Sequence, residues 1–497
     1  MAKAMIKDQL VSKNKIRSEF LAMLSRMYSE ELPEYKQFVE IVNNSNQEFI
    51  KNNPNVKVDK LSRVIEERHG AIRVGKPEEM RIVARIFACL GMEPINFYDL
   101  TSVKKAMPII ATAFRPKTEE EINESAFRMF CSMLFLDDDR FFNDEQRQIA
   151  KTKLAKRKVF SDKLLEILDI AENQGGLTQT QSQAFLEEAV NSFRIDLNQV
   201  IDFKLYKDFI INGNDVAADI ICFSTIHINH LTPRVYDIFD AHQQLKNNNI
   251  PTINEVQGPP KRRNEEALPL LNQTSRKAPG EFIYASTDKK LLNDIDYQYQ
   301  VVKELEENNE IKHIEPKESE DIKDYLNRVE AALKISELKV VAMKHKARFG
   351  EIECRGVALT PEGRAAYDKA ITDGTYVDYY PKTHLELAKK KYAYYKYSLA
   401  NNKKLESKIS KDNLLELAEK GYVILTPITY EDFLPKSAAG IFESNLSSDV
   451  KIREKLENST EFKNQKILEE AIGKKIINSY ELYEAIEQQS ILKLMEF

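Results

Sequence analysis

Cysteine is scarce in this sequence, and its spacing excludes two kinds of structure. The chain has 497 residues and four cysteines, Cys89, Cys131, Cys222 and Cys354. They lie far apart and form no Cys-x-x-Cys pair, so we expect neither a zinc–cysteine site nor a disulfide framework.

Long apolar runs and an excess of basic residues are missing too. No stretch is apolar over the length of a membrane span, and the first twenty residues lack the apolar core of a secretory signal. Lys and Arg number 73 against 78 Asp and Glu, giving a net charge of −5, whereas nucleic-acid-binding domains are typically basic. We therefore expect a cytoplasmic protein with no membrane and no nucleic-acid partner, and the sequence is compatible with an oligomer.

The composition is that of a globular protein, and its patterns divide the chain into regions. Hydrophobic residues make up 42% and charged residues 30% of the sequence. The regions that we expect are N-terminal helices at 1–60, a first βαβββ-like module at 61–116, a helical insertion at 117–200, a second βαβββ-like module at 201–360 interrupted at about 287–340, and a mainly helical C-terminal region at 361–497.

The first module begins with a short strand at 68–75. Pro77 then opens a helix that runs to Leu90 and is stopped by Gly91, and strands are expected at 97–101 and 108–114. This order is strand, helix, strand, strand.

The insertion at 117–200 has helical periodicity and many charges. Helices are expected at 119–136, 145–172 and 178–193. The run Asp137–Asp139 is typical of a solvated acidic turn rather than of a cation site.

A similar order follows in the second module. A strand is expected at 221–231, ended by Pro233, then a helix at 235–247 and strands at 252–256, 268–275 and 348–359. The charged segment at 287–340 is either a lid or a solvated surface insertion, and we favour the insertion.

Three features stand out in the C-terminal region. Tyrosines and lysines alternate at 376–397, which is compatible with single-stranded nucleic acid but favours an ordinary amphipathic helix in an acidic protein. A strand is expected at 421–428. The run 432–446 is rich in small residues, which allow a close approach of the backbone to another group.

Histidine is rare enough for its positions to be informative. The chain has seven, and His227 and His230 lie three residues apart on the strand that opens the second module, while His69 lies on the strand that opens the first. Side chains alternate along a strand, so His227 and His230 cannot both serve one metal. One of them is a candidate ligand and the other a group behind it; the alternative is a hydrogen-bonded histidine at a strand edge.

Two glutamates complete a candidate metal site. Glu351 and Glu353 share one face of the last strand of the second module, where burying a carboxylate is costly unless it is paired or binds a metal. A salt bridge to Arg348 or Arg355 is the alternative. Two histidines and one carboxylate suit non-haem Fe(II) used with dioxygen, although manganese or zinc can occupy the same ligands.

Two further side chains are candidates for substrate binding. Arg73 lies four residues after His69 and on the same face of the strand. A guanidinium beside a metal can bind a substrate carboxylate through two parallel hydrogen bonds. Its alternative role is a structural ion pair. Gln273, on the expected strand 268–275, is a weaker candidate.

These residues resemble those of a known protein family. The paired modules resemble the vicinal-oxygen-chelate superfamily, and HLTPRVYD (230–237) and EIECR (351–355) resemble the matching segments of 4-hydroxyphenylpyruvate dioxygenase and of the related hydroxymandelate synthase. That register favours His230 over His227 and Glu351 over Glu353. A closer resemblance is to the 2-oxoadipate dioxygenase/decarboxylase family, carried by ERHGAIRVG (67–75), HINHLTPR (227–234), ARFGEIECRGVALTPEGR (347–364) and EDFLPKSAAGIFESNL (431–446).

The resemblance implies a fold, a reaction and a site. The fold is α+β, with two βαβββ modules forming a curved sheet around the metal. The reaction converts 2-oxoadipate and O2 to 2-hydroxyglutarate and CO2 in lysine catabolism, with Fe(2+) as the cofactor. His69, His230 and Glu351 would be the ligands, with the two histidines also touching the substrate, and Arg73 would hold a substrate carboxylate. Backbone at Lys436 and Ser437 would also touch the substrate; Lys436 stands where the family has a small apolar residue.

Two other functions remain open from the sequence. One is a metal-dependent isomerase or lyase of the glyoxalase type, which needs no oxygen and no redox metal. The other is a non-catalytic member of the superfamily that only binds a ligand.

Overall fold

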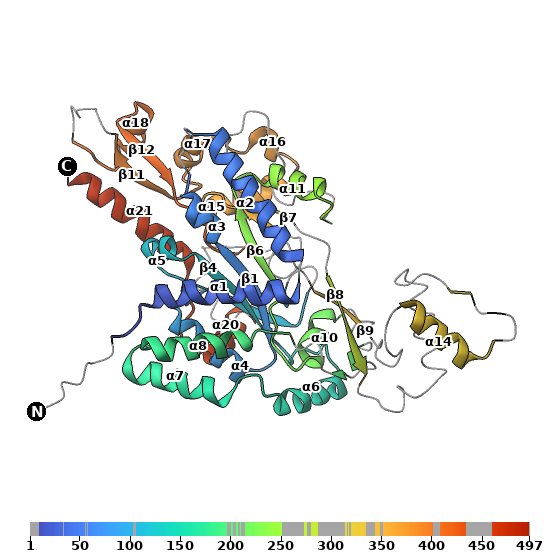
Figure 1. Ribbon diagram of the computed structural model, residues 1–497. Coiled ribbons are helices and arrows are strands. Elements are labelled where there is room, and N and C mark those ends of the chain that lie inside the picture. The colour runs from blue at the N-terminus through green and yellow to red at the C-terminus, as the bar shows by residue number, and fades with distance from the viewer. Residues whose placement is uncertain are drawn as a thin grey trace, which may run out of the picture.

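The structure is a computed structural model that combines a central sheet with many helices (Figure 1). The mixed α+β class expected from the sequence is therefore confirmed. No helix in the described ranges is both long and apolar enough to cross a membrane. The described residues are 9–32, 34–54, 56, 58–102, 106–195, 200–201, 205–206, 209, 214–250, 273–275, 280–286, 314–315, 317, 320–333, 343–347, 351–400, 408–433 and 460–496.

The first half of the central sheet has the expected order of elements. It consists of β1 (Arg68–Val74), α4 (Pro77–Cys89), β2 (Glu93–Asp99), β3 (Ile109–Arg115) and β4 (Phe127–Leu134). The strands lie in the order β2-β3-β4-β1, with β4 parallel to β1 and antiparallel to β3. These elements follow the order strand, helix, strand, strand, strand, with one more short helix between β3 and β4.

Strand β4 corrects the sequence prediction, which placed a helix over 119–136. Only α5 (Glu119–Glu124) is helical, and its start is marked by a capping box at Thr118. The eight residues of β4 are all buried, so the strand reads as one continuous apolar run. Periodicity alone does not separate such a buried strand from a buried helix.

The second half of the sheet repeats this pairing. Its described elements are β6 (His230–Val235), α11 (Ile238–Asn247), β7 (Gln273–Ser275) and β10 (Ile352–Cys354). The sheet continues β1-β6-β10-β7, with β10 parallel to β6 and antiparallel to β7. Strand β10 thus relates to β6 and β7 as β4 relates to β1 and β3. The expected strand at 252–256 lies outside the described residues.

The start of the second half differs from the prediction of a strand at 221–231. Helix α10 (Asp215–Cys222) ends there, residues 223–229 form a loop, and β6 begins only at His230. Pro233 lies inside β6 instead of ending it. Strand β10 reaches β6 only at Arg234 and Val235, so at Pro233 β6 has a partner on one side only, where a missing N–H is tolerated.

The two faces of the sheet carry different cores. On one face, Ile72 and Val74 of β1 belong to a large cluster built with α1 (Lys13–Glu31), α2 (Glu34–Asn52), α7 (Asp162–Gln174) and α8 (Gln179–Asn191). On the other face, Ala71 joins a smaller cluster with α6 (Asp144–Lys156) and α10. The predicted helix at 145–172 is thus two helices, α6 and α7. His69 shares this second face with Ala71.

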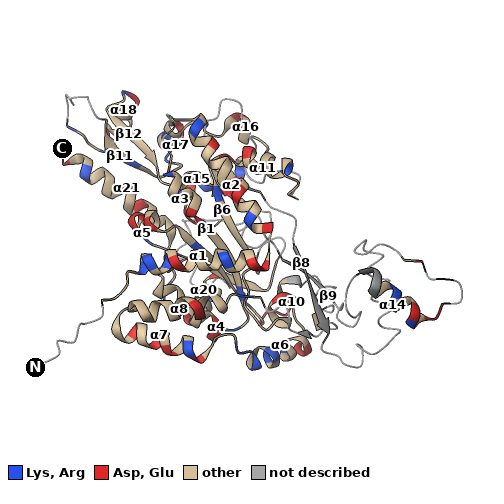
Figure 2. Ribbon diagram, in the orientation of Figure 1, with Lys and Arg blue, Asp and Glu red and all other residues tan. Residues whose placement is uncertain are grey.

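The predicted acidic turn at Asp137–Asp139 is also present. Asp138 pairs with Arg140, and Asp139 pairs with Arg147. Charges of both signs are interspersed on the outer helices, in keeping with the small net charge (Figure 2).

The remaining helices and strands are not part of the central sheet. The prediction of one helix over 376–397 is wrong at its end, because Tyr395 and Tyr397 lie on a strand that pairs with 423–427, within the strand expected at 421–428. These elements are α3 (Leu61–Glu66), β5 (Val200–Ile201), β8 (Gly280–Ser286), α14 (Ile322–Leu333), β9 (Met343–Ala347), α15 (Pro361–Thr372), α16 (Tyr376–Tyr379), α17 (His384–Lys389), β11 (Tyr395–Leu399), α18 (Leu414–Glu419), β12 (Val423–Pro427), α20 (Thr460–Ile472) and α21 (Ser479–Met495).

Candidate metal centre and its surroundings

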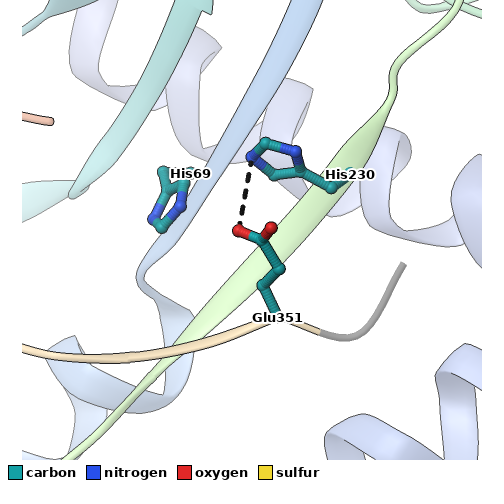
Figure 3. Close-up of side chains that lie close together, drawn as sticks. All are labelled: His69, His230 and Glu351. Atoms are coloured by element: carbon teal, nitrogen blue, oxygen red, sulfur yellow. Dashed lines mark ion pairs between the residues drawn. The ribbon is translucent and has the colours of Figure 1, made fainter. Parts of the chain in front are cut away.

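Three side chains from three separate parts of the chain converge on the second face of the sheet. His69 comes from β1, His230 from the first position of β6, and Glu351 from the residue just before β10 (Figure 3). One ligand atom from each lies within 4.8 Å of the others, and all three side chains are buried. The Nε2 atom of His230 is 4.0 Å from Oε2 of Glu351.

Strand register explains why the two histidines meet. Strands β1 and β6 run antiparallel, with His69 opposite Thr232 and Ala71 opposite His230. His69 and Ala71 share a face, so His230 is the diagonal neighbour of His69, and their ring centroids are 5.7 Å apart.

Gly70 permits the close approach of the two strands at this point. A Cβ atom at Gly70 would lie 3.0 Å from the Ile228 side chain and 3.1 Å from the backbone oxygen of His230. The contact with backbone is the harder one to relieve, because it requires β6 to move away from β1. Glycine therefore sets the spacing between the strands that carry the histidines.

A second carboxylate lies behind His69. Glu353 Oε2 is 3.0 Å from Nδ1 of His69, and its other neighbours are Arg355 at 3.1 Å and Arg128 at 3.6 Å. A histidine whose Nδ1–H donates to a carboxylate presents Nε2 to a metal, and this arrangement is common in metal sites. The structure thus places Glu353, our alternate ligand, behind His69.

Glu67 lies at the centre of a buried network of charges next to β1. Its carboxylate accepts hydrogen bonds from Arg234, Arg128 and Arg355 at 2.9, 3.0 and 3.3 Å. Burial alone would raise the pKa of Glu67, but the charges of Arg234, Arg128 and Arg63 outweigh it and lower the pKa from 4.5 to about 2. The carboxylate therefore stays ionised, and it ties β4, β6 and β10 to the start of β1.

The stretch that follows β12 also reaches this centre. The ring of Phe433 lies 5.1 Å from that of His69, and Arg128 lies over the same ring at 5.5 Å. The neighbouring Asp432 is held in the core by Arg115 through two hydrogen bonds of 2.7 and 3.2 Å. The first two residues of the small-residue run are thus fixed in the core, with Phe433 beside His69.

Arg73 and His227 lie together, next to the three-residue cluster. Nη1 of Arg73 is 2.5 Å from Oδ2 of Asp219 and 3.0 Å from Oδ1 of Asn229. His227 lies in the loop before β6, with Nε2 3.4 Å from Oδ1 of Asp219. The structure therefore brings His230, and not His227, beside His69 and Glu351.

The other sequence candidates have less structural support. Gln273 lies on β7, paired with Cys354 of β10, and Lys436 and Ser437 lie outside the described residues.

Sequence reasoning also missed several residues of this region. Asp219 was hidden in a stretch expected to lie just before a strand, and no sequence signal links it to Arg73. Glu67 and Phe433 were quoted in motifs, but their spacing carries no sign of a contact with the site.

The donor set fits a metal ion. Two imidazoles and one carboxylate form a combination that binds divalent transition metals and leaves coordination positions for other molecules. Their burial in a sheet core, with a carboxylate hydrogen-bonded behind one imidazole, is typical of a site in which the ligands are oriented in advance.

The chain is similar to known proteins over most of its length. The family model described as 2-oxoadipate dioxygenase/decarboxylase matches residues 20–304 and 328–445. Curated proteins named 2-oxoadipate dioxygenase/decarboxylase are 32% identical in Escherichia coli, over 97% of this chain and 98% of that protein, and in Mycobacterium bovis, over 98% and 99%.

A solved structure is similar over the same length. The crystal structure of hydroxyglutarate synthase from Pseudomonas putida in complex with 2-oxoadipate superimposes with a TM-score of 0.77 and 28% identity, covering 98% of this chain and 99% of that one. The matches extend over nearly the whole chain and include the segments that carry the two histidines and the glutamate. The protein therefore belongs to the 2-oxoadipate dioxygenase/decarboxylase family.

Proposed function

We propose that this protein is an Fe(II)-dependent dioxygenase that converts 2-oxoadipate and O2 to 2-hydroxyglutarate and CO2, a step suited to lysine catabolism. The observation that carries the proposal is the buried His69–His230–Glu351 cluster in a chain of this family. Relatives are named for this reaction, and one was crystallised with 2-oxoadipate.

The reaction balances without any other reductant. The bond between C1 and C2 of 2-oxoadipate breaks and C1 leaves as CO2. One oxygen atom of O2 enters the new carboxylate at C2, and the other is inserted into a C–H bond at C3 to give the hydroxyl group. The four electrons that O2 accepts all come from the substrate.

His69, His230 and Glu351 would hold the metal ion in this proposal. Fe(II) held by these residues would supply the one-electron chemistry that lets O2 react with a closed-shell organic acid. The Glu353 carboxylate holds His69 in the tautomer that a metal ligand requires.

In this proposal, residues near the three metal ligands bind the substrate and exclude water. Arg73 is the candidate anchor for a substrate carboxylate. Phe433 and Phe130, whose rings are 5.5 Å apart, form an apolar wall beside His69. A dry wall protects a reactive centre from side reactions with solvent. Backbone contacts at Lys436 and Ser437 stay part of the proposal.

We also propose that the sheet is a vicinal-oxygen-chelate fold. The supporting observation is the equivalent placement of β4 next to β1 and of β10 next to β6, with His69 and His230 on the two strands that open the halves.

Product analysis tests the proposed reaction. Protein loaded with Fe(II) in air should form 2-hydroxyglutarate and CO2 from 2-oxoadipate, and much less product from 2-oxoglutarate or 4-hydroxyphenylpyruvate. The same protein loaded with zinc in the absence of oxygen should be inactive. Activity of the zinc protein without oxygen would instead favour an isomerase or lyase, and failure to bind any metal would favour a member that only binds a ligand.

A further inference from the structure

Asn229 is a buried amide whose orientation is fixed by Arg73. Its side chain is 6% exposed, and its Oδ1 accepts a hydrogen bond from Nη1 of Arg73 at 3.0 Å. Because an amide carries an acceptor on one side and a donor on the other, this bond directs Nδ2 away from Nη1. Within the described parts of the chain, the buried Nδ2 has no hydrogen-bond partner.

The guanidinium of Arg73 also has N–H donors for which the described residues provide no acceptor. Nη1 carries two N–H groups, and the oxygens of Asp219 and Asn229 accept from it at 2.5 and 3.0 Å. The described residues provide no acceptor for Nε and Nη2, the two donors that form the parallel fork for a carboxylate. Arg73 and Asn229 together therefore offer three donor nitrogen atoms, Nε and Nη2 of Arg73 and Nδ2 of Asn229.

Asp219 holds this arrangement in place. It comes from α10, its side chain is 4% exposed, and its second oxygen lies 3.4 Å from Nε2 of His227. The ion pair with Asp219 keeps the long Arg73 side chain in one position and balances its charge while no substrate is bound. A buried polar donor without an acceptor is costly, so Nδ2 of Asn229, beside the partly exposed guanidinium of Arg73, favours a ligand that accepts hydrogen bonds.

The position of this group along β1 fits the far end of the substrate. Arg73 is four residues beyond His69 on the same face of the strand, about 13 Å along it at a rise of ~3.3 Å per residue. In the proposed reaction, the carboxylate and keto oxygens at C1 and C2 lie at the metal. The second carboxylate of 2-oxoadipate is five carbon–carbon bonds further along a chain that extends away from it.

We propose that Asn229 binds the far carboxylate of the substrate together with Arg73, and that Asp219 is a positioning residue that holds Arg73 for this contact. The inference rests on the proposed function for the direction of the substrate. It assigns the choice of a dicarboxylic 2-oxo acid to the Arg73–Asn229 pair rather than to the metal ligands.

The test compares two acids of equal length. 2-Oxohexanoate has a methyl group where 2-oxoadipate has its far carboxylate. Binding of both acids to the metal-free protein is measured by calorimetry, and KM and kcat are measured on the Fe(II)-loaded protein. Asn229→Asp keeps the acceptor for Arg73 but replaces the Nδ2 donor by a negative charge.

The expected result is a selective loss. Asn229→Asp should weaken binding of 2-oxoadipate and raise its KM by about a hundredfold, while values for 2-oxohexanoate stay within about twofold. Asp219→Asn should raise KM for 2-oxoadipate by about tenfold and should add little to the effect of Arg73→Gln in the double variant. Asp99→Asn is the control. Asp99 is a buried carboxylate elsewhere in the sheet that accepts hydrogen bonds from Thr101 and Asn464, and its replacement should not change the preference for 2-oxoadipate over 2-oxohexanoate in binding or in KM.

Two results would overturn the proposal. Equal losses for both acids in Asn229→Asp and in the second variant Asn229→Ala would assign Asn229 a purely structural role. Equal binding of the two acids by the metal-free wild type would show that no group in the chain recognises the far carboxylate. A wild type that prefers 2-oxoadipate in calorimetry but forms no product would leave this inference standing and contradict the proposed reaction.

Discussion

At the scale of single residues, two glutamates that were expected on one strand face have different neighbours in the structure. Glu351 and Glu353 are two residues apart, but Glu351 lies beside His230 and Glu353 lies behind His69. The sequence predicted that both carboxylates share a face, and it left open which one was the ligand. Only the three-dimensional register separates the proposed ligand Glu351 from Glu353, which contacts Nδ1 of His69.

Removing a proposed ligand should remove the metal. His230→Ala and Glu351→Ala each take one of three donors, so the iron content after Fe(II) loading and desalting should fall to near that of an unloaded sample, with a loss of turnover. Elemental analysis beside a circular dichroism spectrum checks both metal and fold. A folded variant that keeps a full equivalent of iron and turns over normally would show that another residue is the ligand.

Glu353→Gln should have a smaller effect on the same measurement. The amide of the glutamine can still contact Nδ1 of His69, but it lacks the negative charge that favours a proton on Nδ1. The expected loss of metal affinity is about 10- to 100-fold. Competition with a chelator gives the dissociation constant. An unchanged constant would mean that Glu353 serves only the arginines around it.

At the scale of elements, a buried network of charges adds to the strand pairing and apolar packing of the sheet. Glu67, between α3 and β1, binds arginines of β4 and β6 and Arg355, which follows β10. None of these arginines looks unusual in the sequence, because each one alternates with apolar residues as a surface residue would. A buried network of this kind was therefore not predictable from periodicity, whereas β1 and α4, which have clear boundary signals, were.

Glu67→Gln should destabilise the fold. Removing one partner leaves buried arginines without their counter-charge, at a cost of about 3–5 kcal/mol in the free energy of unfolding. Urea unfolding at pH 7 measures it. Glu66→Gln, at the exposed neighbouring position, is the matched control and should change stability by less than about 0.5 kcal/mol. Equal stabilities of the two variants would contradict a central role for Glu67.

The same carboxylate predicts a pH dependence. The pKa of Glu67 is lowered from 4.5 to about 2, so its contribution, about 3 kcal/mol, is fully present above pH 4.5 and is lost as the pH falls from about 4.5 to about 2. The stability difference between wild type and Glu67→Gln should therefore shrink across that window. A difference that is constant between pH 5 and pH 2.5 would show that the charge of Glu67 does not contribute.

At the scale of the whole molecule, the site is assembled from segments that are distant in the sequence. His69, Asp219, His230, Glu351 and Phe433 span most of the chain, and the sheet register brings them together. Residue types and motif resemblance were enough to name His69, His230 and Glu351 as candidate ligands, and the structure brings these three side chains together. They were not enough to find Asp219 and Asn229, whose contacts with Arg73 depend on where α10 and the loop before β6 lie relative to β1.

The most direct test of the proposed reaction follows both atoms of dioxygen. Fe(II)-loaded protein is supplied with 2-oxoadipate under dioxygen labelled with oxygen-18, and the product is analysed by mass spectrometry. A dioxygenase that decarboxylates and hydroxylates the same molecule predicts 2-hydroxyglutarate with two labelled oxygens, one in a carboxylate and one in the hydroxyl group. Product without label, or glutarate with a single label, would contradict it.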